Sequence, residues 1–356
     1  MKVAILGAGL SGLACAIECE RLGVQAEIFE RGTSVGWIYP SVNFWPNIFY
    51  NHIGDVRNHI KKEYRIDFTS LNDTDTLVMK SARKQTVVKG TLGLSIIRGK
   101  ADKSLENQLL LQINKTPIHY NYLGHYDELA KQYDYVVVAT GREIEARDMG
   151  VWQDEDAVTT IGGTALGSFD INSSTIYFNT EYAGTGYGRV TPMNQQCATI
   201  GLYIFGRPEI QALELFQKFI QMEELDKLEY LFRYIPPVFI TGKVTEFQKD
   251  NVILTGAAAG LVDRVLGVGA VEAMVSGTLA ARAIAWKEDY TSMVKPLQTH
   301  IESISAFRKS LNKFDNDDFD KVISVLGMPG IKQAVYNTSV NFVGMAGSIL
   351  KTLNKS

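Results

Sequence analysis

The spacing of apolar residues changes several times along this chain. Unbroken apolar runs at residues 3–6 and 135–139 each lead into a glycine turn, and a third run, at residues 252–254, precedes Gly256. Short apolar runs bounded by glycine are typical of strands buried on both faces of a parallel sheet. Residues 12–23, closed by Gly23, predict a helix, and residues 24–31 predict the next strand.

Other segments follow a period of two or a helical period. Residues 75–97 alternate as antiparallel strands do, and residues 158–248 add strand-like runs around one charged helix at 209–232. Residues 100–113 predict an amphipathic helix, and the chain is expected to be helical from residue 286 onward. The last helix, within residues 330–355, is expected to pack on the body, with covering a substrate cavity or touching a membrane surface as alternatives.

The order of these segments predicts an α/β fold with an inserted β-rich block. Two runs of parallel-sheet character flank that block, so one domain is expected to be assembled from separate pieces. The predicted discontinuous Rossmann-like domain comprises residues 1–70, 91–157 and 249–286. An antiparallel β-sheet substrate domain comprises residues 71–90 and 158–248, and residues 287–356 form a C-terminal helical region.

Composition narrows the function classes. The 356 residues are 46% apolar and 21% charged, with a net charge of −3, so nucleic-acid binding is not expected. The three cysteines lack the spacing of metal ligands and the five histidines form no pattern, so no metal site is predicted and a reducing, cytoplasmic location is expected. We expect no signal peptide before the first strand, and no run reaches the roughly 18 apolar residues of a membrane span.

The sequence Gly7-Ala-Gly9-Leu10-Ser11-Gly12 is the first chemical motif. It lies between a buried strand and a helix, and Glu30 follows at the end of the next strand. This complete unit predicts a dinucleotide site, with phosphates at the helix N-terminus and Glu30 on the ribose hydroxyls. The motif alone does not separate NAD from FAD.

Three further segments resemble those of the geranylgeranyl reductase family of FAD-dependent oxidoreductases, relatives of the p-hydroxybenzoate hydroxylase-like flavoproteins. Residues 133–141 resemble the family's second strand and turn, and residues 251–270 resemble its Gly-Asp-Ala-Ala…Gly-x-Gly segment. Residues 186–203 look like its Tyr-x-Trp-x-Phe-Pro…Gly signature. Arg98, with Asp102 and Leu105, matches its Arg-x-x-x-Asp-x-x-Leu helix start. The order of these segments covers residues 1 to about 290.

The resemblance implies that the discontinuous domain binds FAD, with the first glycine segment at the ADP end and the second at the flavin. Gly267 and Gly269 would lie beside the isoalloxazine, with the N–H groups of Gly269 and Ala270 facing its pyrimidine edge. Arg98 would reach the pyrophosphate and Leu123 the adenine, with a surface arginine as the alternative for Arg98. The remaining implied FAD contacts are Gly7, Gly9, Leu10, Ser11, Gly12, Glu30, Arg31, Ser41, Val42, Ala139, Thr140, Gly141, Gly256 and Ala257.

Two family positions differ. The Asp that follows the first glycine of the flavin segment is Ala257 here, and loss of one charge-assisted hydrogen bond of about 1.5–3 kcal/mol would weaken FAD binding roughly ten- to a hundredfold. The family's flavin-facing Cys aligns with Ser41, whose hydroxyl forms no thiolate at neutral pH.

The substrate residues implied by the resemblance are Tyr187, Arg189, Thr191 and Pro192. Arg189 replaces the family's Trp and Thr191 its Phe, and we expect Arg189 to recognise an anionic group. Trp45, in the aromatic stretch 37–50, is expected to be either part of an apolar substrate wall or a core residue. Tyr187 is the candidate proton donor.

The leading hypothesis is reduction of a carbon–carbon double bond in an apolar, isoprenoid-type substrate by hydride from reduced FAD. NAD(P)H or a ferredoxin-like carrier would supply electrons. The alternatives are a flavin monooxygenase of the aromatic hydroxylase type and a non-catalytic flavoprotein-like lipid-binding protein.

Overall fold

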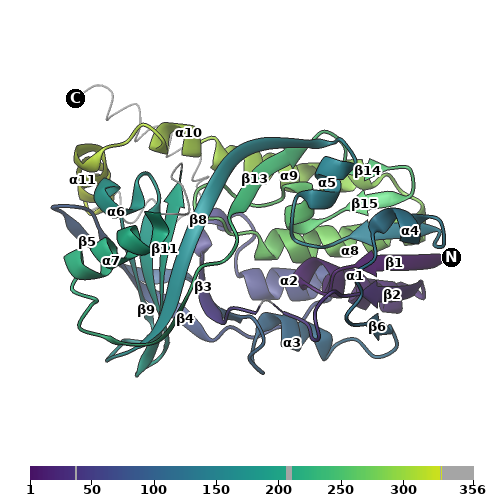
Figure 1. The fold of residues 1–356 in the computed structure, drawn as a ribbon, viewed down its shortest axis with the longest axis horizontal. Helices are drawn as coiled ribbons and strands as arrows, with labels where there is room; N and C mark the ends of the chain where they lie inside the picture. The colour runs from purple at the N-terminus through teal and green to yellow at the C-terminus, as the bar shows by residue number, and fades with distance from the viewer. Residues whose placement is uncertain (37, 206–210, 329, 331–356) are drawn as a thin grey trace.

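Two sheets lie next to each other in the computed structural model, which describes residues 1–36, 38–205, 211–328 and 330 (Figure 1). The smaller sheet has the strand order β14-β15-β7-β1-β2-β6 and is parallel except at β14. Its strands are β1 (Lys2–Leu6), β2 (Gln25–Phe29), β6 (Ile118–His119), β7 (Tyr135–Val138), β14 (Gln248–Lys249) and β15 (Val252–Leu254). The apolar runs predicted to be parallel strands are thus confirmed.

Helices cover this sheet, and two of them pack with little space between their backbones. They are α1 (Leu10–Leu22), α2 (Val56–Tyr64), α3 (Leu105–Leu110), α4 (Tyr126–Ala130), α5 (Ile144–Asp148), α8 (Ala270–Trp286) and α9 (Tyr290–Ser305). A Cβ at Gly277 of α8 would lie 2.0 Å from the main-chain oxygen of Ser11 in α1, so only glycine permits this approach. Glu18 of α1 is fully buried and is paired with Arg21 and Arg282, which fixes the two helices further.

The chain leaves the smaller sheet after β7 and returns to it at β14 and β15. Strands β7 and β15 are neighbours in the sheet, although the inserted block separates them in the sequence. Val252 in β15 pairs in parallel with Val136 in β7, although 115 residues separate them. The discontinuous α/β architecture expected from the sequence is therefore confirmed.

The larger sheet has nine strands in the order β12-β8-β11-β10-β9-β4-β5-β3, with β13 also paired to β8. These are β3 (Ser41–Pro46), β4 (Asn72–Lys80), β5 (Gln85–Arg98), β8 (Trp152–Leu166), β9 (Ser173–Tyr177), β10 (Tyr187–Asn194), β11 (Cys197–Phe205), β12 (Glu229–Tyr234) and β13 (Phe239–Val244). All its pairs are antiparallel except β4 with β9. The remaining helices of the two sheet regions are α6 (Thr180–Ala183), α7 (Ala212–Met222) and the short 3₁₀ helices η1 (Asn47–Phe49) and η3 (Gly256–Ala259).

Several expectations from the sequence need correction. Strand β3 and the second half of β5, both assigned to the FAD-binding pieces, pair with each other in the larger sheet. The helix expected over 209–232 ends at Met222, because Glu229–Tyr234 pairs with β8 and tertiary pairing overrides local preference. The helix expected over 100–113 is shorter, because the Ser104 side chain caps α3 at its start. The domain boundaries themselves stay a prediction.

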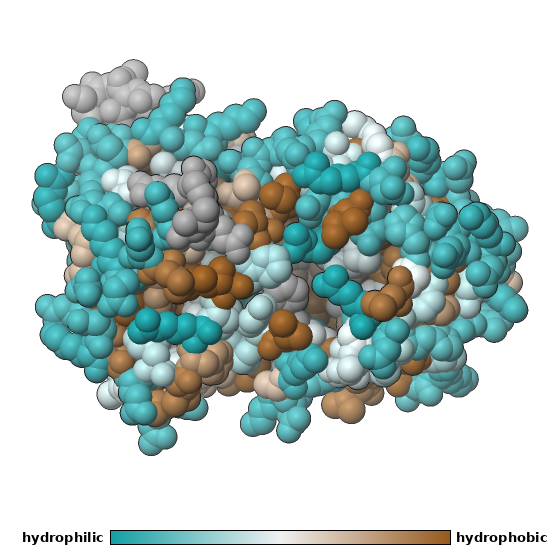
Figure 2. Space-filling model, viewed as in Figure 1, coloured by the Kyte–Doolittle hydropathy of each residue, from teal (hydrophilic) through white to brown (hydrophobic). Residues whose placement is uncertain are grey.

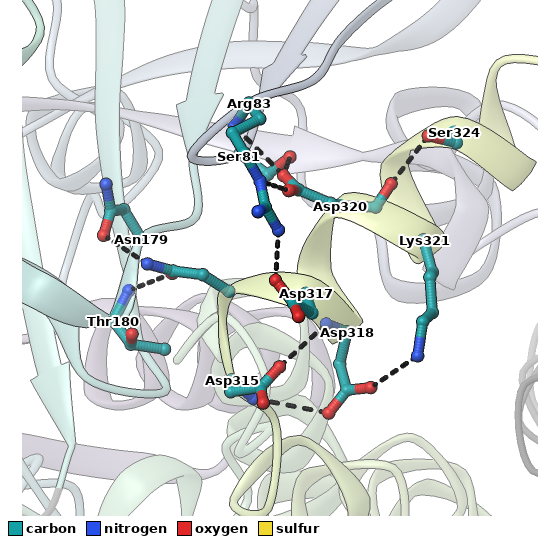
Figure 3. Close-up of polar contacts among 11 residues, drawn as sticks. Ser81, Arg83, Asn179, Thr180, Asp315, Asp317, Asp318, Asp320, Lys321 and Ser324 are labelled. Carbon is teal, nitrogen blue, oxygen red and sulfur yellow. Dashed lines mark hydrogen bonds and ion pairs between the residues drawn. The ribbon is translucent and has the colours of Figure 1, made fainter.

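The C-terminal region packs on the larger sheet through a polar cluster (Figure 3). Asp320 of α11 (Asn316–Leu326) accepts hydrogen bonds from the side chains of Ser81 and Arg83, between β4 and β5, at 2.6 Å each. Asn316 contacts Asn179 at the start of α6. Helix α10 (Arg308–Leu311) precedes α11. The predicted last helix lies outside the described residues, apart from its first residue.

The surface seen in Figure 2 is hydrophilic at both ends, with apolar patches toward the middle, where the two sheet regions meet. Within the ranges that the structure describes, no helix is long and apolar enough to cross a membrane.

Candidate functional site

The first glycine turn joins β1 to α1 and is held by the neighbouring strands. Gly7 has φ +108°, and its Cβ would lie 2.6 Å from the oxygen of Ala139, so this position requires glycine for both conformation and space. A Cβ at Gly12 would lie 2.0 Å from the oxygen of Gly7, so Gly12 lets α1 pack on the turn. The predicted strand–turn–helix unit is present.

Gly9 is not explained by packing within the protein. Its φ of −83° suits any residue, and a Cβ there would meet only one atom within 4 Å, the Ala139 oxygen at 3.9 Å. Gly9 is also the N-cap of α1 and has no side chain to accept from the first N–H groups of the helix. A ligand that approaches the backbone and accepts these hydrogen bonds accounts for the glycine, so the turn fits a pyrophosphate.

Glu30 follows β2 directly and closes the same turn. One carboxylate oxygen accepts from the N–H of Ala8 at 2.7 Å, and the other accepts from the N–H of Gly32 at 2.6 Å. Glu30 therefore lies beside the glycine turn, as a ribose ligand must, and also shapes the loop after β2. Arg31, in this loop, is exposed.

Leu10 and Ser11 contribute to the turn mainly through their position at the helix start. The Leu10 side chain is buried. The Ser11 hydroxyl donates to the Thr255 hydroxyl at 2.5 Å, which ties α1 to the strand that precedes η3. The N–H groups of these residues, rather than their side chains, remain the predicted phosphate contacts.

Arg98 and Leu123, which are expected to contact the pyrophosphate and the adenine, lie in different environments. Arg98 is the last residue of β5 rather than a helical residue, and its Nε lies 2.8 Å from the buried carboxylate of Glu106. Its charge is thus paired within the protein, and its contact with the pyrophosphate stays a prediction. Leu123 lies between β6 and α4 and is 89% exposed.

Ala139, Thr140 and Gly141 follow β7, beside the first turn. The N–H of Ala139 donates to the oxygen of Leu6 at 2.8 Å, which aligns the two strand ends. Thr140 donates its hydroxyl to Glu145. The carboxyl ends of β1 and β7 therefore meet at one edge of the sheet, where ligands bind in open α/β folds.

The flavin segment begins at Gly256, whose N–H donates to the Ser276 hydroxyl at 2.9 Å. Ala257, where the resemblance led us to expect Asp, is half-buried at the start of η3. At the far end of the segment Gly269 is the N-cap of α8 and has no capping side chain. The first N–H groups of α8 thus donate no hydrogen bond to an N-cap side chain, and the helix start suits an anionic edge of a ligand.

Asp263 shapes the loop between η3 and α8, which we call the flavin loop (residues 260–269). Its carboxylate accepts from the N–H groups of Val265, Leu266 and Val268 at 2.6–2.9 Å. Burial raises the pKa of Asp263 to about 6, although these N–H groups act in the opposite direction. Sequence analysis missed Asp263. An Asp shortly before a Gly-x-Gly segment is the signal that could have found it.

The larger sheet touches the flavin loop through Tyr187. The Tyr187 hydroxyl donates to the main-chain oxygen of Leu266 at 2.6 Å, and its ring stacks on Tyr203 with centroids 4.6 Å apart. Burial raises the pKa of Tyr187 well above its ordinary value. The predicted proton donor thus has its proton directed at a loop carbonyl, which is the arrangement of a positioning residue.

Arg189 is buried without a carboxylate partner among the described residues. Its guanidinium donates to the oxygen of Val42 and to the hydroxyl of Tyr203, both at 3.0 Å, and lies 5.4 Å from the Tyr203 ring centroid. Only 5% of Arg189 is exposed. A buried cation whose partners are all neutral retains capacity for an anion. Tyr203, which sequence analysis missed, joins Tyr187 and Arg189.

The remaining substrate candidates separate into two groups. Thr191 is fully buried and its hydroxyl has no hydrogen-bond partner, and Pro192 follows it in β10. Trp45, in β3, is 1% exposed and packs in the same apolar core as the strands of the smaller sheet, with its ring against Phe68. This burial matches the core alternative expected for Trp45.

Ser41 and Val42 open β3, where Ser41 pairs with Arg98. The N–H of Val42 donates to the Thr199 hydroxyl at 3.1 Å, and its oxygen accepts from Arg189. Both backbone groups of Val42 are therefore occupied within the larger sheet. Its expected role as a cofactor contact is not supported by this bonding.

Comparison with known proteins supports this architecture. Residues 5–56 match the model of an NAD(P)-binding Rossmann-like domain family. The chain is 27% identical over 172 residues to a digeranylgeranylglycerophospholipid reductase from Methanosphaera stadtmanae, a match that covers 44% of this chain and 42% of that protein. The chain thus spans less than half the length of this curated relative.

Solved structures share the fold over nearly the whole chain. A geranylgeranyl bacteriochlorophyll reductase-like protein from Thermoplasma acidophilum has a TM-score of 0.77 at 18% identity, covering 99% of this chain and 98% of that one. A flavin-dependent brominase has a TM-score of 0.70 at 12% identity, with both chains fully covered. The expected resemblance to geranylgeranyl reductases and the α/β fold class are confirmed.

Proposed function

We propose that this protein is an FAD-dependent oxidoreductase that reduces a carbon–carbon double bond in an apolar, isoprenoid-type substrate carrying an anionic group. Reduced FAD, when bound, would supply the hydride. The glycine turn at Gly9 and the uncapped start of α8 would bind its two ends through backbone N–H groups. Glu30 would hold the ribose.

The observation that carries this proposal is the hydrogen bond between Tyr187 and Leu266. It brings the buried Tyr187, Arg189 and Tyr203 cluster of the larger sheet against the loop that would hold the flavin. A substrate resting on these aromatic rings would therefore lie beside the cofactor. Orientation at such short range is a main source of rate enhancement.

The polar groups of this cluster would select the substrate. Arg189 would bind an anionic group such as a diphosphate or carboxylate, because its present partners leave its charge uncompensated. The buried hydroxyl of Thr191 would gain its missing hydrogen bond from the same group. The surrounding rings would exclude water from an apolar chain.

Electrons would come from NAD(P)H or a ferredoxin-like carrier. The digeranylgeranylglycerophospholipid reductase gives a chemical precedent for a lipid substrate, and peripheral contact with a membrane would follow from such a substrate. A cytoplasmic location remains part of the proposal.

The cofactor is tested by the absorption spectrum of the freshly purified protein. We expect flavin bands that are released as FAD on denaturation, and, in the reduced protein, slow reoxidation by oxygen alone. A colourless protein that cannot be reconstituted with FAD would contradict the proposal and favour a non-catalytic lipid-binding protein. Rapid oxygen-dependent NAD(P)H consumption stimulated by an aromatic compound would favour a monooxygenase instead.

A further inference from the structure

A buried acid at the start of α8 has no role in the function proposed above. Glu272 lies in the first turn of α8 and is 3% exposed. The Tyr50 hydroxyl lies 3.1 and 3.3 Å from its two carboxyl oxygens. Among the described residues, no Lys, Arg or His pairs with Glu272. The groups that act on it are Tyr50, its own N–H and the carboxylate of Asp263 in the flavin loop.

This environment keeps a proton on Glu272. Burial, together with the nearby negative charge of Asp263, raises the pKa of Glu272 to about 8, against the hydrogen bonds from Tyr50 and the backbone. Burial also raises the pKa of Tyr50 well above its ordinary value. Both groups therefore carry protons at neutral pH, and Glu272 lies in the first helical turn after the flavin loop.

The rings of two histidines, His300 and His52, lie between Tyr50 and the protein surface. The ring of His300, on α9, has its centroid 6.3 Å from that of Tyr50, and its Nε2 is buried without a hydrogen-bond partner. The ring of His52 lies 4.6 Å from that of His300, and His52 is exposed. Burial, with the neighbouring His52, lowers the pKa of His300 to about 4, so this ring is neutral and can accept a proton.

We propose that His52, His300, Tyr50 and Glu272 form the route that carries protons from solvent to the flavin loop. This inference rests on the proposed function, because saturating a carbon–carbon double bond consumes one hydride and one proton. The hydride comes with the cofactor, whereas the proton must enter from solvent into a site enclosed by two sheets.

The transfer is balanced. Glu272 releases its carboxyl proton toward the site and takes the hydroxyl proton of Tyr50. His300 first takes a proton from solvent, by way of His52, on its unpartnered Nε2, and then gives that proton to Tyr50. One proton has then moved inward and every group has returned to its starting state. Bridging water ordinarily completes transfer between neighbouring polar groups that do not touch.

Infrared spectroscopy of the purified protein tests the inner end of the route, with or without FAD. We expect a protonated-carboxyl band that disappears with a midpoint near the pKa of about 8 and that is missing from Glu272→Gln. The control, Glu302→Gln, changes an exposed acid on α9 and retains the band. A band that persists in Glu272→Gln, or that is missing from the unchanged protein, would overturn the inference.

Proton uptake tests the route itself. A pH-indicator dye reports uptake when the FAD-bound protein is reduced photochemically. Tyr50→Phe should slow uptake at least tenfold with FAD content unchanged. The control is Tyr290→Phe, which removes another buried hydroxyl, one that donates to Leu254. Equal rates in Tyr50→Phe and the unchanged protein would refute the route. A protein that never binds FAD would refute the proposed function instead, and the infrared result would stand separately.

Discussion

The hydroxyl of Tyr187, in the larger sheet, donates a hydrogen bond to the main-chain oxygen of Leu266, in the flavin loop, at 2.6 Å. Tyr187 and Leu266 are 79 residues apart and belong to the two different sheet regions. Their contact makes the position of the flavin loop depend on the face that would hold the substrate. The inferred proton route ends next to the same loop, at Glu272 in the first turn of α8.

Tyr187→Phe should loosen the flavin loop without disturbing the ring stack. Loss of one buried hydrogen bond of about 1–1.5 kcal/mol predicts FAD binding weakened roughly five- to tenfold. Because burial holds the pKa of Tyr187 far above neutrality, the effect should not change across the neutral range. Fluorescence titration with FAD measures it. Tyr203→Phe is the control, because Tyr203 bonds Arg189 and not the loop. Equal losses in both variants would show that the loop contact has no special role.

Arg189→Met should discriminate between charged and uncharged substrates. Methionine keeps the apolar stem and removes the charge, so KM for a prenyl diphosphate should rise roughly ten- to a hundredfold, as expected for a charged hydrogen bond of about 1.5–3 kcal/mol. KM for the matching prenyl alcohol should change little. Arg189→Lys should lie between the two, because lysine keeps the charge without the planar fork. A similar rise for the alcohol would mean that Arg189 only maintains the packing.

Glu30→Gln should weaken FAD binding roughly tenfold or more. Both carboxylate oxygens of Glu30 already accept backbone hydrogen bonds, from Ala8 and Gly32, and glutamine has only one acceptor oxygen. The turn would lose one of these bonds and the ribose its charged acceptor. Calorimetric titration with FAD measures the change. Glu27→Gln, on the same strand and paired with His119, should bind FAD normally. Unchanged affinity in Glu30→Gln would exclude Glu30 as the ribose ligand.

Glu272→Gln should change how stability depends on pH. The pKa of Glu272 is raised from 4.5 to about 8 on folding, so between these values the folded state binds more protons than the unfolded state. The free energy of unfolding should therefore fall as pH rises through this window, by up to a few kcal/mol at about 1.4 kcal/mol per pKa unit.

The glutamine variant should lack this part of the slope. Urea unfolding at about pH 5 and about pH 9 should show similar stability at the lower pH and a more stable variant at the higher one. Asp263, whose pKa is raised to about 6, should leave a smaller slope in both proteins. Parallel curves for the two proteins would show that Glu272 is not protonated when buried.

Local sequence patterns predicted the parts of the fold that depend on neighbours in the chain. The glycine turn at Gly7 and Gly9, the parallel strands and the α8 start at Gly269 all combine a periodic apolar run with a glycine. Pairing between strands that are far apart in the sequence was harder to predict from local patterns. The local pattern predicts a helix up to residue 232 and does not reveal strand β12 there, because its partner β8 lies more than sixty residues earlier.

The candidate site likewise combines features that local sequence predicts with contacts that form only on folding. Arg189 and Tyr187 could be placed on one face of a strand from their alternation alone. Their partners could not be predicted, because Tyr203 and Leu266 reach them only through tertiary folding. Trp45 shows a second limit: an aromatic stretch indicates burial, but sequence does not say whether the ring meets a substrate or the core.

Single-turnover reduction of a prenyl substrate tests the central claim most directly. The FAD-bound protein would be reduced without oxygen and mixed with a prenyl diphosphate, while flavin absorbance and product mass are recorded. The account predicts that the oxidised flavin bands return and that the product gains two hydrogen atoms for each flavin reoxidised. Bound FAD that stays reduced with prenyl diphosphates, prenyl alcohols and digeranylgeranyl lipids, yet reoxidises as it hydroxylates an aromatic compound once oxygen is admitted, would contradict it.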